Sequence, residues 1–262
     1  VRCGQGSHKY ISGDVFTGMW AEGIRSDGPG RVVYKRAGGD EYTGYFACHQ
    51  ATVTGIPATY VRHGQGKMVW ADGLTPMLSR EENLKSYEGA WNEDQMECEQ
   101  AVCIYLNGDK FTGCFANDRR VRKGKGVMEY ADGAVYDGAF EFDKRHGPGC
   151  MKYANGDIYE GDWRNGKRNG QGKHVDHSII RKTHPVGTIS NIDVTVTGDE
   201  YVGCWRDDKR FGIGCMTYGN GDVYDGRWDD DERAGRGTMT YGNENNEYIY
   251  DGEWVGVIMA YA

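Results

Sequence analysis

The stretch NGDIYEGDWRNGKRNGQGK, residues 155–173, contains five glycines around an alternation of Tyr159, Gly161 and Trp163. Successive side chains of a strand point to opposite faces, so these three residues would share one face of a strand. Glycine inside a strand or helix costs about 0.5–1 kcal/mol relative to alanine. Such frequent glycine therefore requires a structural reason.

The same pattern recurs along most of the chain. An aromatic-X-Gly-X-aromatic motif begins each copy, and most copies continue with Gly-X-Gly, an aromatic residue four positions later and a turn such as ADG or ANG. The cleanest period is 23 residues, from 136 to 159 and from 201 to 224. A period in this range is typical of stacked supersecondary units. The copies begin at Phe16, Tyr42, Tyr87, Phe111, Tyr136, Tyr159, Tyr201 and Tyr224.

Within one copy the spacing predicts a β-hairpin. The strand of Tyr159 and Trp163 would be followed by a six-residue turn, RNGKRN (164–169), and a returning strand. Asn155-Gly156 would join successive hairpins through a tight primed turn, in which both central residues have positive φ. Gly161 would leave bare backbone on which an aromatic ring of a neighbouring strand can lie. Gly166 would lie at the hairpin tip.

These units predict a single array over residues 1–262. It comprises a half-repeat at 1–15, eight repeats beginning at 16, 42, 87, 111, 136, 159, 201 and 224, a half-repeat at 250–262, and insertions at 47–63, 74–86 and 176–200. Ile192, Val194 and Val196 alternate, which suggests an additional strand. Glu99 and Ala101 replace the Gly-X-Gly of the third copy, so we expect a local bend or a displaced ring there. Because both termini interrupt a repeat, we expect a longer array, or ends that pack on something else.

Composition excludes several classes of protein. The 262 residues include 41 glycines, 18 tyrosines and 7 tryptophans, too many aromatics for a disordered linker. The net charge of −8 opposes general binding to nucleic acid. No apolar run approaches the roughly 20 residues of a membrane helix. Nothing in the sequence suggests secretion.

The eight cysteines are predicted to be reduced packing residues. Cys114 and Cys204 follow the same motif, in FTGCF and YVGCW, and Cys150 and Cys215 follow GPG and GIG. Thiols at repeat-equivalent positions indicate small side chains in a reducing compartment. There is no CxxC, and Cys98 and Cys103 have no matching pair of histidines, so no metal site is predicted.

The sequence predicts no enzyme. GKRNGQGK (166–173) resembles a phosphate-binding loop, but its glycine falls one residue late and His174 replaces Ser or Thr. DDDER (229–233) lacks the alternating ligands of a calcium loop. His174 and His177 have no nucleophile or acidic partner in a recognisable arrangement. Accordingly, no catalytic, cofactor-binding or metal-binding residue is predicted.

YEGDWRNGKRNGQGK, YDGAFEFDKRHGPGCMKYANGD and YVGCWRDDKRFGIGCMTYGNGD resemble MORN (membrane occupation and recognition nexus) repeats. The resemblance implies an all-β fold: an elongated, twisted, single-layer antiparallel meander of about eight hairpins without catalytic residues. Similar chains without other domains occur in radial spoke heads of axonemes and in basal-body or cortical scaffolds. By analogy, we expect a structural scaffold that binds other proteins in a cytoplasmic, cytoskeletal assembly, in the axoneme of a cilium or flagellum or at the basal body.

An open sheet offers faces and edges for strand addition, dimerisation or docking of a partner. The expected partner-binding face consists of Tyr136, Phe140, Tyr153, Tyr159, Trp163, Tyr201, Trp205, Tyr218, Tyr224 and Trp228. A homodimer is a further expectation. One alternative is a membrane-proximal adaptor that binds phosphoinositides or other anionic lipids through Arg119, Arg120, Arg122 and Lys123. A second alternative is an accessory module of a larger enzyme complex.

Overall fold

The computed structural model describes residues 1–34, 39–49, 59–71, 84–116, 121–177, 179–181, 194–196, 198–243 and 246–256. These residues form strands and turns and no helix. They therefore contain no helix that could cross a membrane. The chain divides into two compact units, Val1–Ala131 and Asp132–Ala262, which are described separately.

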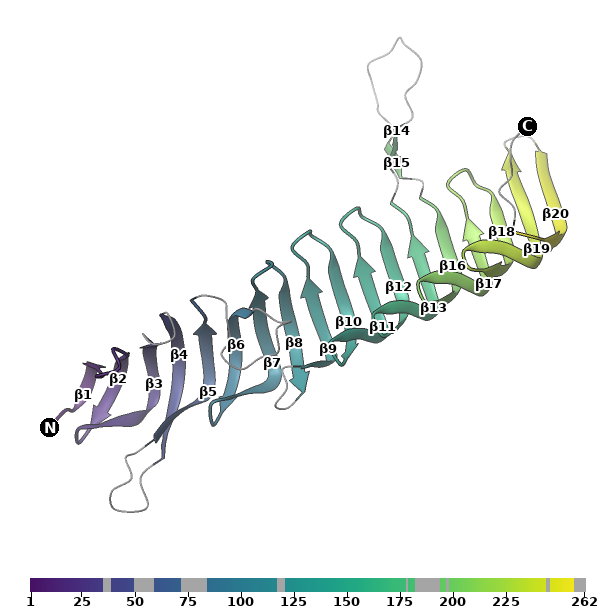
Figure 1. The fold of residues 1–262 in the computed structure, drawn as a ribbon. Coiled ribbons are helices and arrows are strands. Elements are labelled where there is room, and N and C mark those ends of the chain that lie inside the picture. Colours follow the sequence, from purple (N-terminus) through teal and green to yellow (C-terminus); the bar gives the residue numbers. More distant parts are fainter. Residues whose placement is uncertain are drawn as a thin grey trace, which may run out of the picture. The chain divides into compact units, whose positions relative to one another are not determined.

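In the first unit each strand pairs antiparallel with the next one in the sequence (Figure 1). Its strands are β1 (Gly4–Lys9), β2 (Val15–Ala21), β3 (Ile24–Tyr34), β4 (Asp40–His49), β5 (Thr59–Val69), β6 (Leu84–Asn92), β7 (Gln95–Tyr105), β8 (Lys110–Ala116) and β9 (Val121–Glu129). The predicted insertions therefore contribute residues 47–49 to β4, 59–63 to β5 and 84–86 to β6. Residues 50–58 and 72–83 lie outside the described part.

The strands of the second unit are β10 (Val135–Glu141), β11 (Lys144–Lys152), β12 (Ile158–Arg164), β13 (Lys167–Val175), β14 (Ile179–Arg181), β15 (Val194–Val196), β16 (Glu200–Arg206), β17 (Lys209–Thr217), β18 (Val223–Asp229), β19 (Glu232–Asn243) and β20 (Asn246–Trp254). Each strand of the main sheet also pairs antiparallel with the next, except that β13 pairs with β16 and the intervening β14 and β15 pair with each other. The all-β, single-layer antiparallel meander is confirmed. The strand predicted from the alternation of Val194 and Val196 exists as β15, which pairs with β14, whereas Ile192 lies outside the described residues.

The second glycine of Gly-X-Gly makes room for a ring of the neighbouring strand, as predicted, whereas the glycine of Tyr-X-Gly lies under the ring of its own strand. Gly161 on β12 and Gly172 on β13 lie directly opposite each other. A Cβ atom added to Gly172 would lie 2.6 Å from ring atoms of Tyr159, and one added to Gly161 would lie 2.7 Å from its hydroxyl oxygen. The ring of Tyr159 thus lies on a glycine of its own strand and on a glycine of the neighbouring strand, and it is completely buried.

A β-bulge follows the glycine pair in each complete hairpin of the second unit. Between the pairs Gly161–Gly172 and Trp163–Arg168, β13 contains two more residues than β12. Gly170, within the bulge, has φ +108°, a conformation that favours glycine. The first glycine of Gly-X-Gly therefore shapes the backbone, and the second accommodates a ring.

The turn predictions need correction. The predicted six-residue turn at 164–169 has only two central residues, because β12 continues to Arg164 and β13 begins at Lys167. Asn165 and Gly166 have φ of 51° and 87°, so the primed turn lies here. Asn155 does not have positive φ. It belongs to a longer loop, in which the Tyr153 N–H donates to Asp157 O (2.8 Å) and the Gly156 N–H donates to Tyr153 O (2.9 Å).

The third repeat keeps its ring in place without the second glycine. Tyr87 is 1% exposed, and an added Cβ at Gly89 would meet its hydroxyl oxygen at 2.6 Å, so the ring is not displaced. Ala101, opposite Gly113 on β8, is completely buried. The pairing of β6 with β7 contains an additional register shift between Leu84 and Ser86. Within the described residues, no other hairpin has a shift at this end.

Candidate interaction site

The ten aromatic residues predicted for partner binding lie in the second unit and differ in accessibility. Tyr153 and Tyr218 are half-buried at the ends of strands, next to the turns. The other eight are at most 6% exposed: Tyr136, Phe140, Tyr159, Trp163, Tyr201, Trp205, Tyr224 and Trp228. These eight rings form the core of a sheet that has no second layer, and of the ten predicted residues only Tyr153 and Tyr218 keep an accessible ring. Partner binding at this face stays a prediction.

The buried rings contact one another from repeat to repeat. The centroid of Tyr159 lies 5.1 Å from that of Trp163 in its own repeat and 5.4 Å from that of Trp205 in the next repeat. The ring planes are nearly perpendicular, the edge-to-face geometry that aromatic pairs prefer. The same two contacts recur along the unit from Tyr136 to Trp254. Each repeat therefore packs its core against the next.

Hydrogen bonds fix the orientation of these rings. Trp205 Nε1 donates to Gly172 O of the preceding hairpin (3.3 Å), and Trp163 Nε1 donates to Gly149 O in the same way (3.2 Å). The Tyr159 hydroxyl donates to Asp162 O (3.0 Å). Burial raises the pKa of Tyr159, so its hydroxyl remains a proton donor. The indole groups thus connect repeats, and the phenols anchor their own strands.

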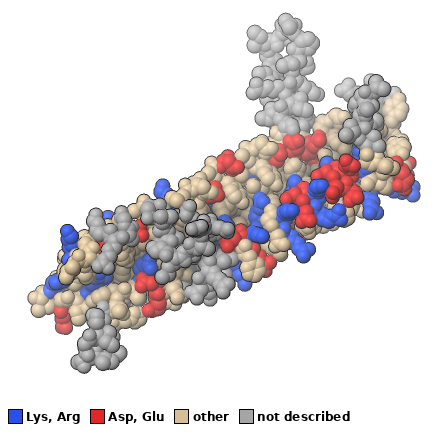
Figure 2. All heavy atoms as spheres, viewed as in Figure 1, with Lys and Arg blue, Asp and Glu red and all other residues tan. Residues whose placement is uncertain are grey.

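In the second unit an arginine near the start of each returning strand of a hairpin covers the rings at the hairpin tips. We call Arg145, Arg168, Arg210 and Arg233 the arginine row of the second unit. The Arg168 guanidinium carbon lies 4.2 Å from the centroid of the Trp205 ring, within the range of a cation–π interaction. The backbone N–H and Nε of Arg168 both donate to Asp208 Oδ1, at 2.9 and 3.3 Å. Basic and acidic side chains consequently alternate near these tips (Figure 2).

Aspartates hold the repeats together at the opposite ends of the strands. Asp157 Oδ1 accepts a hydrogen bond from the His177 N–H (3.0 Å), and Asp222 Oδ1 accepts one from the Gly242 N–H (3.0 Å). Burial acts to raise the pKa of Asp157, but hydrogen bonds, chiefly from the His177 N–H and the Asn155 side chain, hold it below its usual value. Each turn is thereby connected to the chain one repeat further on.

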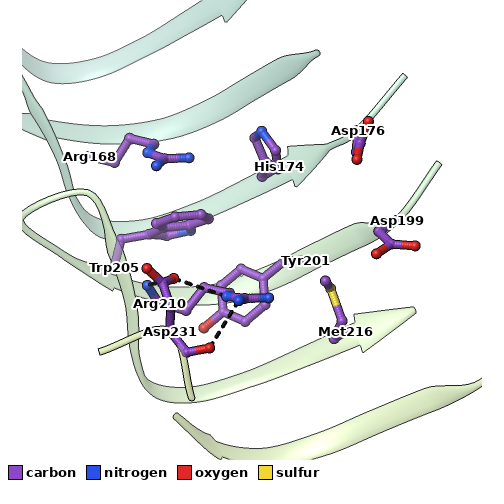
Figure 3. A pocket seen from close by; sticks show the side chains of 9 residues that line it. All are labelled: Arg168, His174, Asp176, Asp199, Tyr201, Trp205, Arg210, Met216 and Asp231. Carbon is purple, nitrogen blue, oxygen red and sulfur yellow. Dashed lines mark hydrogen bonds and ion pairs between the residues drawn. The ribbon is translucent and has the colours of Figure 1, made fainter. Parts of the chain in front are cut away.

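Asp176 interrupts the succession of tyrosines next to the turns. It follows β13 at the position that Tyr153 occupies after β11 and Tyr218 after β17. A hollow with a volume of about 360 Å³ opens over the ring-bearing face at this repeat (Figure 3). It is lined by Arg168, His174, Asp176, Asp199, Tyr201, Trp205, Arg210, Met216 and Asp231. Figure 3 shows the arginines and Trp205 toward the hairpin tips and the two aspartates Asp176 and Asp199 at the opposite strand ends.

His174 lies in this hollow at the position of Met151 and Met216 in the neighbouring repeats. Its ring meets those of Trp205 and Tyr153 edge-on, with centroids 6.1 and 6.4 Å away. Burial lowers the pKa of His174, and the positive charge of Arg168 acts in the same direction. His174 is therefore a neutral part of the wall near pH 7.

A second hollow, of about 260 Å³, lies in the first unit between Tyr10, Tyr34 and Tyr60. Arg25 lies within it, with its guanidinium carbon 4.0 Å from the centroid of Phe16. Arg25 Nε donates to the hydroxyl oxygen of Tyr10 (2.7 Å). Val32 takes the place of the methionine found in most repeats. This hollow thus already contains phenol groups of the chain.

The basic residues proposed for lipid contact are only partly described. Arg119 and Arg120 lie outside the described residues. Arg122 is half-buried, with its guanidinium carbon 5.7 Å from the centroid of Phe111, and Lys123 is exposed. Arg122 thus has the position of the arginine row, and Lys123 faces solvent. Lipid binding by these residues stays a prediction.

Seven cysteines are free in the structure: Cys3, Cys48, Cys103, Cys114, Cys150, Cys204 and Cys215. The side chain of Cys98 is not described. Burial raises the pKa of Cys150 and Cys215, and neighbouring carboxylates act in the same direction. Among the described residues, no group of three or more His, Cys, Asp or Glu side chains is placed to hold a metal ion.

Two features of the site were not recognised from the sequence, although the sequence contains their signals. The arginine row follows the first aromatic residue of the repeat at a spacing of nine, as from Tyr136 to Arg145 and from Tyr159 to Arg168. The hollow is signalled by the fourth residue after the second glycine. That residue is aromatic after Gly149 and Gly214 but is Asp176 after Gly172.

Comparison with known proteins identifies the repeat. The family model for the MORN repeat matches residues 61–75, 111–135, 136–158, 159–177, 201–223 and 224–245. No curated protein matches the chain. Among solved structures, the chain is similar to the wild-type TCP10 domain of Danio rerio CPAP in complex with a peptide of Danio rerio STIL. That similarity has 10% identity and a TM-score of 0.39, and it covers 95% of this chain and 99% of the other.

Proposed function

The chain belongs to the MORN-repeat family, and on that basis we propose that it is a non-catalytic scaffold that binds other proteins in a cytoskeletal assembly. The finer part of the proposal is a cytoplasmic location in an axoneme, as in radial spoke heads, or at a basal body. In this function the side chains act structurally, because their contacts fix the positions of neighbouring strands and repeats. None of them is assigned a role in covalent chemistry.

The observation that carries the proposal is the way in which repeats are joined. In the second unit an interface between repeats contains an edge-to-face ring contact, an indole-to-carbonyl hydrogen bond and an arginine paired with an aspartate, as at Trp205, Gly172, Arg168 and Asp208. In a repeat protein, stability is the sum of such nearest-neighbour terms. Because these contacts recur in successive repeats, they favour a stiff scaffold on which partner proteins can be arranged.

The surfaces that remain accessible suit protein contacts. On the sheet face opposite the rings, Val202 and Ile213 are 47% and 63% exposed. They flank the paired glycines Gly203 and Gly214. Charged side chains surround them, including Lys173, which pairs with Glu200 at 2.9 Å. These side chains offer apolar contact area within a charged surround to another protein, or to a second copy of the same chain.

The test is the location of the chain in a ciliated cell after detergent extraction. A scaffold of this class remains with the extracted cytoskeleton, and microscopy finds it with axonemal or basal-body markers. Proximity labelling then identifies proteins of one such assembly as its neighbours. Complete loss on extraction would refute the cytoskeletal part of the proposal. Enrichment of one metabolic enzyme complex would favour the accessory-module alternative.

The lipid alternative is tested separately by co-sedimentation with vesicles containing anionic lipid. The scaffold proposal expects weak binding that does not change when Arg122 and Lys123 are replaced by glutamate together with Arg119 and Arg120. Strong, salt-sensitive binding that this variant loses would establish the membrane adaptor instead.

A further inference from the structure

Four tyrosines provide an internal template for the position that Asp176 occupies. In each case the backbone N–H of the residue donates to the carbonyl oxygen of the aspartate that closes the turn. The bonds are Tyr10 to Asp14 (2.9 Å), Tyr105 to Asp109 (2.9 Å), Tyr153 to Asp157 (2.8 Å) and Tyr218 to Asp222 (2.8 Å). The Asp176 N–H donates to Asp199 O in the same way, at 2.8 Å. Asp176 therefore has the backbone environment of a tyrosine position.

The template also shows where a phenol lies at this position. The Arg25 guanidinium carbon lies 5.0 Å from the centroid of the Tyr10 ring, and its Nε donates to the hydroxyl oxygen of that ring at 2.7 Å. The centroid of the Tyr105 ring likewise lies 5.9 Å from the guanidinium carbon of Arg122. The phenol thus extends along the ring-bearing face toward an arginine of the hairpin tips.

At Asp176 the side chain is too short to extend in this way. The space that a phenol would fill is the hollow of about 360 Å³, and its walls are those of a tyrosine position. Arg168, Arg210 and the ring of Trp205 lie toward the hairpin tips, and the ring of Tyr201 lies between them and the strand ends of Asp176 and Asp199 (Figure 3). Aromatic surface with a few polar groups is typical of a binding site for a side chain or small ligand.

We propose that this hollow binds a tyrosine side chain of a partner protein. The occupant is a phenol because four tyrosines of the chain occupy the equivalent position and because the arginines can donate to a hydroxyl oxygen. It does not come from the neighbouring insertion, since residues 177–198 contain no Tyr, Phe or Trp. Asp176 and Asp199 make the mouth acidic, so basic residues next to the tyrosine fit best. This inference rests on the proposed function as a protein-binding scaffold.

The direct test uses the peptide N-acetyl-Lys-Tyr-Lys-amide and the full chain. Binding is followed by NMR through the indole N–H of Trp205 and the ring of His174. We expect saturable shifts at these two residues and at least tenfold weaker binding of N-acetyl-Lys-Ala-Lys-amide. Equal binding of the two peptides, or shifts confined to residues outside the hollow, would overturn the proposal.

Variants of the chain test the site itself. Asp176→Tyr supplies the missing ring, so it should raise the melting temperature and weaken tyrosine-peptide binding at least tenfold. Thr217→Tyr, which adds a tyrosine to the opposite face of β17 at an exposed position, is the matched control and should leave binding unchanged. Tyr218→Asp should open an equivalent hollow one repeat away and raise the stoichiometry from one peptide to two. Full binding by Asp176→Tyr, or an unchanged stoichiometry in Tyr218→Asp, would refute the assignment.

The same variant separates this inference from the proposed function. If Asp176→Tyr keeps both its cytoskeletal location and all its neighbours in proximity labelling, the scaffold stands and the tyrosine site is refuted. Loss of one neighbour from an otherwise unchanged set would support both. If the wild-type chain binds the tyrosine peptide in its hollow but does not remain with the cytoskeleton, the cytoskeletal proposal is refuted and the site stands.

Discussion

The replacement Gly172→Ala tests whether the glycines exist to make room for rings. Gly172 lies on β13 opposite Gly203 on β16, and its φ is not positive, so alanine causes no backbone strain there. An added methyl group would lie 2.6 Å from ring atoms of Tyr159. Carbon atoms in van der Waals contact are about 3.5–4.0 Å apart. The ring must therefore move by about 1 Å.

The cost of that movement follows from the contacts of Tyr159. Its hydroxyl loses the hydrogen bond to Asp162 O, worth about 0.5–1.5 kcal/mol. Its edge-to-face contacts with Trp163 and Trp205 weaken, and each is worth about 0.5–1.5 kcal/mol. Together these terms give a destabilisation of about 2–4 kcal/mol, at the upper end of the usual cost of overpacking. For a protein of this size that corresponds to a fall in Tm on the order of 10 °C.

Thermal denaturation monitored by near-ultraviolet circular dichroism measures this effect, and hydrogen exchange locates it. The matched control is Gly6→Ala. Gly6 is the second glycine of a Gly-X-Gly and also pairs with a glycine, Gly18, but an added methyl group there meets only Trp20, at an ordinary 3.5 Å. Its effect should be within about 0.5 kcal/mol. The reasoning fails if the two variants melt at the same temperature, or if faster exchange in Gly172→Ala does not centre on β12, β13 and β16.

Three further predictions concern single groups. Because burial lowers the pKa of His174, the folded chain binds a proton at this residue less readily than the unfolded chain. The free energy of unfolding should therefore fall as the pH decreases through 6.5. Urea titrations at pH 7.5 and 5.5 measure this fall, and His174→Met should make it smaller. Gly166→Ala should lower the free energy of unfolding by about 1 kcal/mol, because Gly166 has φ +87°. The methyl group itself meets nothing within 4 Å, so backbone strain is the whole cost. An unchanged Tm would show that the turn relaxes to negative φ. Cys150 should react with a thiol reagent at pH 8 much more slowly than the exposed Cys3, because burial raises its pKa, and mass spectrometry of the labelled peptides gives both rates.

Much of the fold could be predicted because the repeat is short and strictly periodic. The alternation of Tyr159, Gly161 and Trp163 defines a strand with one ring-bearing face, and glycine at the paired position defines where the ring lies. These are local properties of a strand and its neighbour. They hold even in the third repeat, where the ring of Tyr87 keeps its place although Ala101 replaces glycine.

The turns and the site were harder to predict because they depend on geometry between repeats. Asn-Gly occurs at both ends of the hairpin, at 155–156 and at 165–166, and only the second pair forms a primed turn. The side chain of Asp157 bonds to the chain one repeat further on and favours the longer loop at the first pair. Likewise, the sequence alone presents Arg168 as an ordinary charged residue of a hairpin tip. Its position over Trp205 depends on the β-bulge in its hairpin and on the next repeat.

The bond between the Asp176 N–H and Asp199 O closes a narrow neck at the base of a long excursion of the chain. The same hydrogen bond closes the five-residue turns elsewhere in the chain, as from Tyr153 to Asp157. The pairing of the flanking strands therefore does not depend on the number of residues between Asp176 and Asp199. This independence from length makes the segment a suitable insertion site. A fluorescent reporter or an affinity domain with adjacent termini, spliced between residues 177 and 198, should leave the strand pairing on either side intact and give a labelled molecule without altering either terminus.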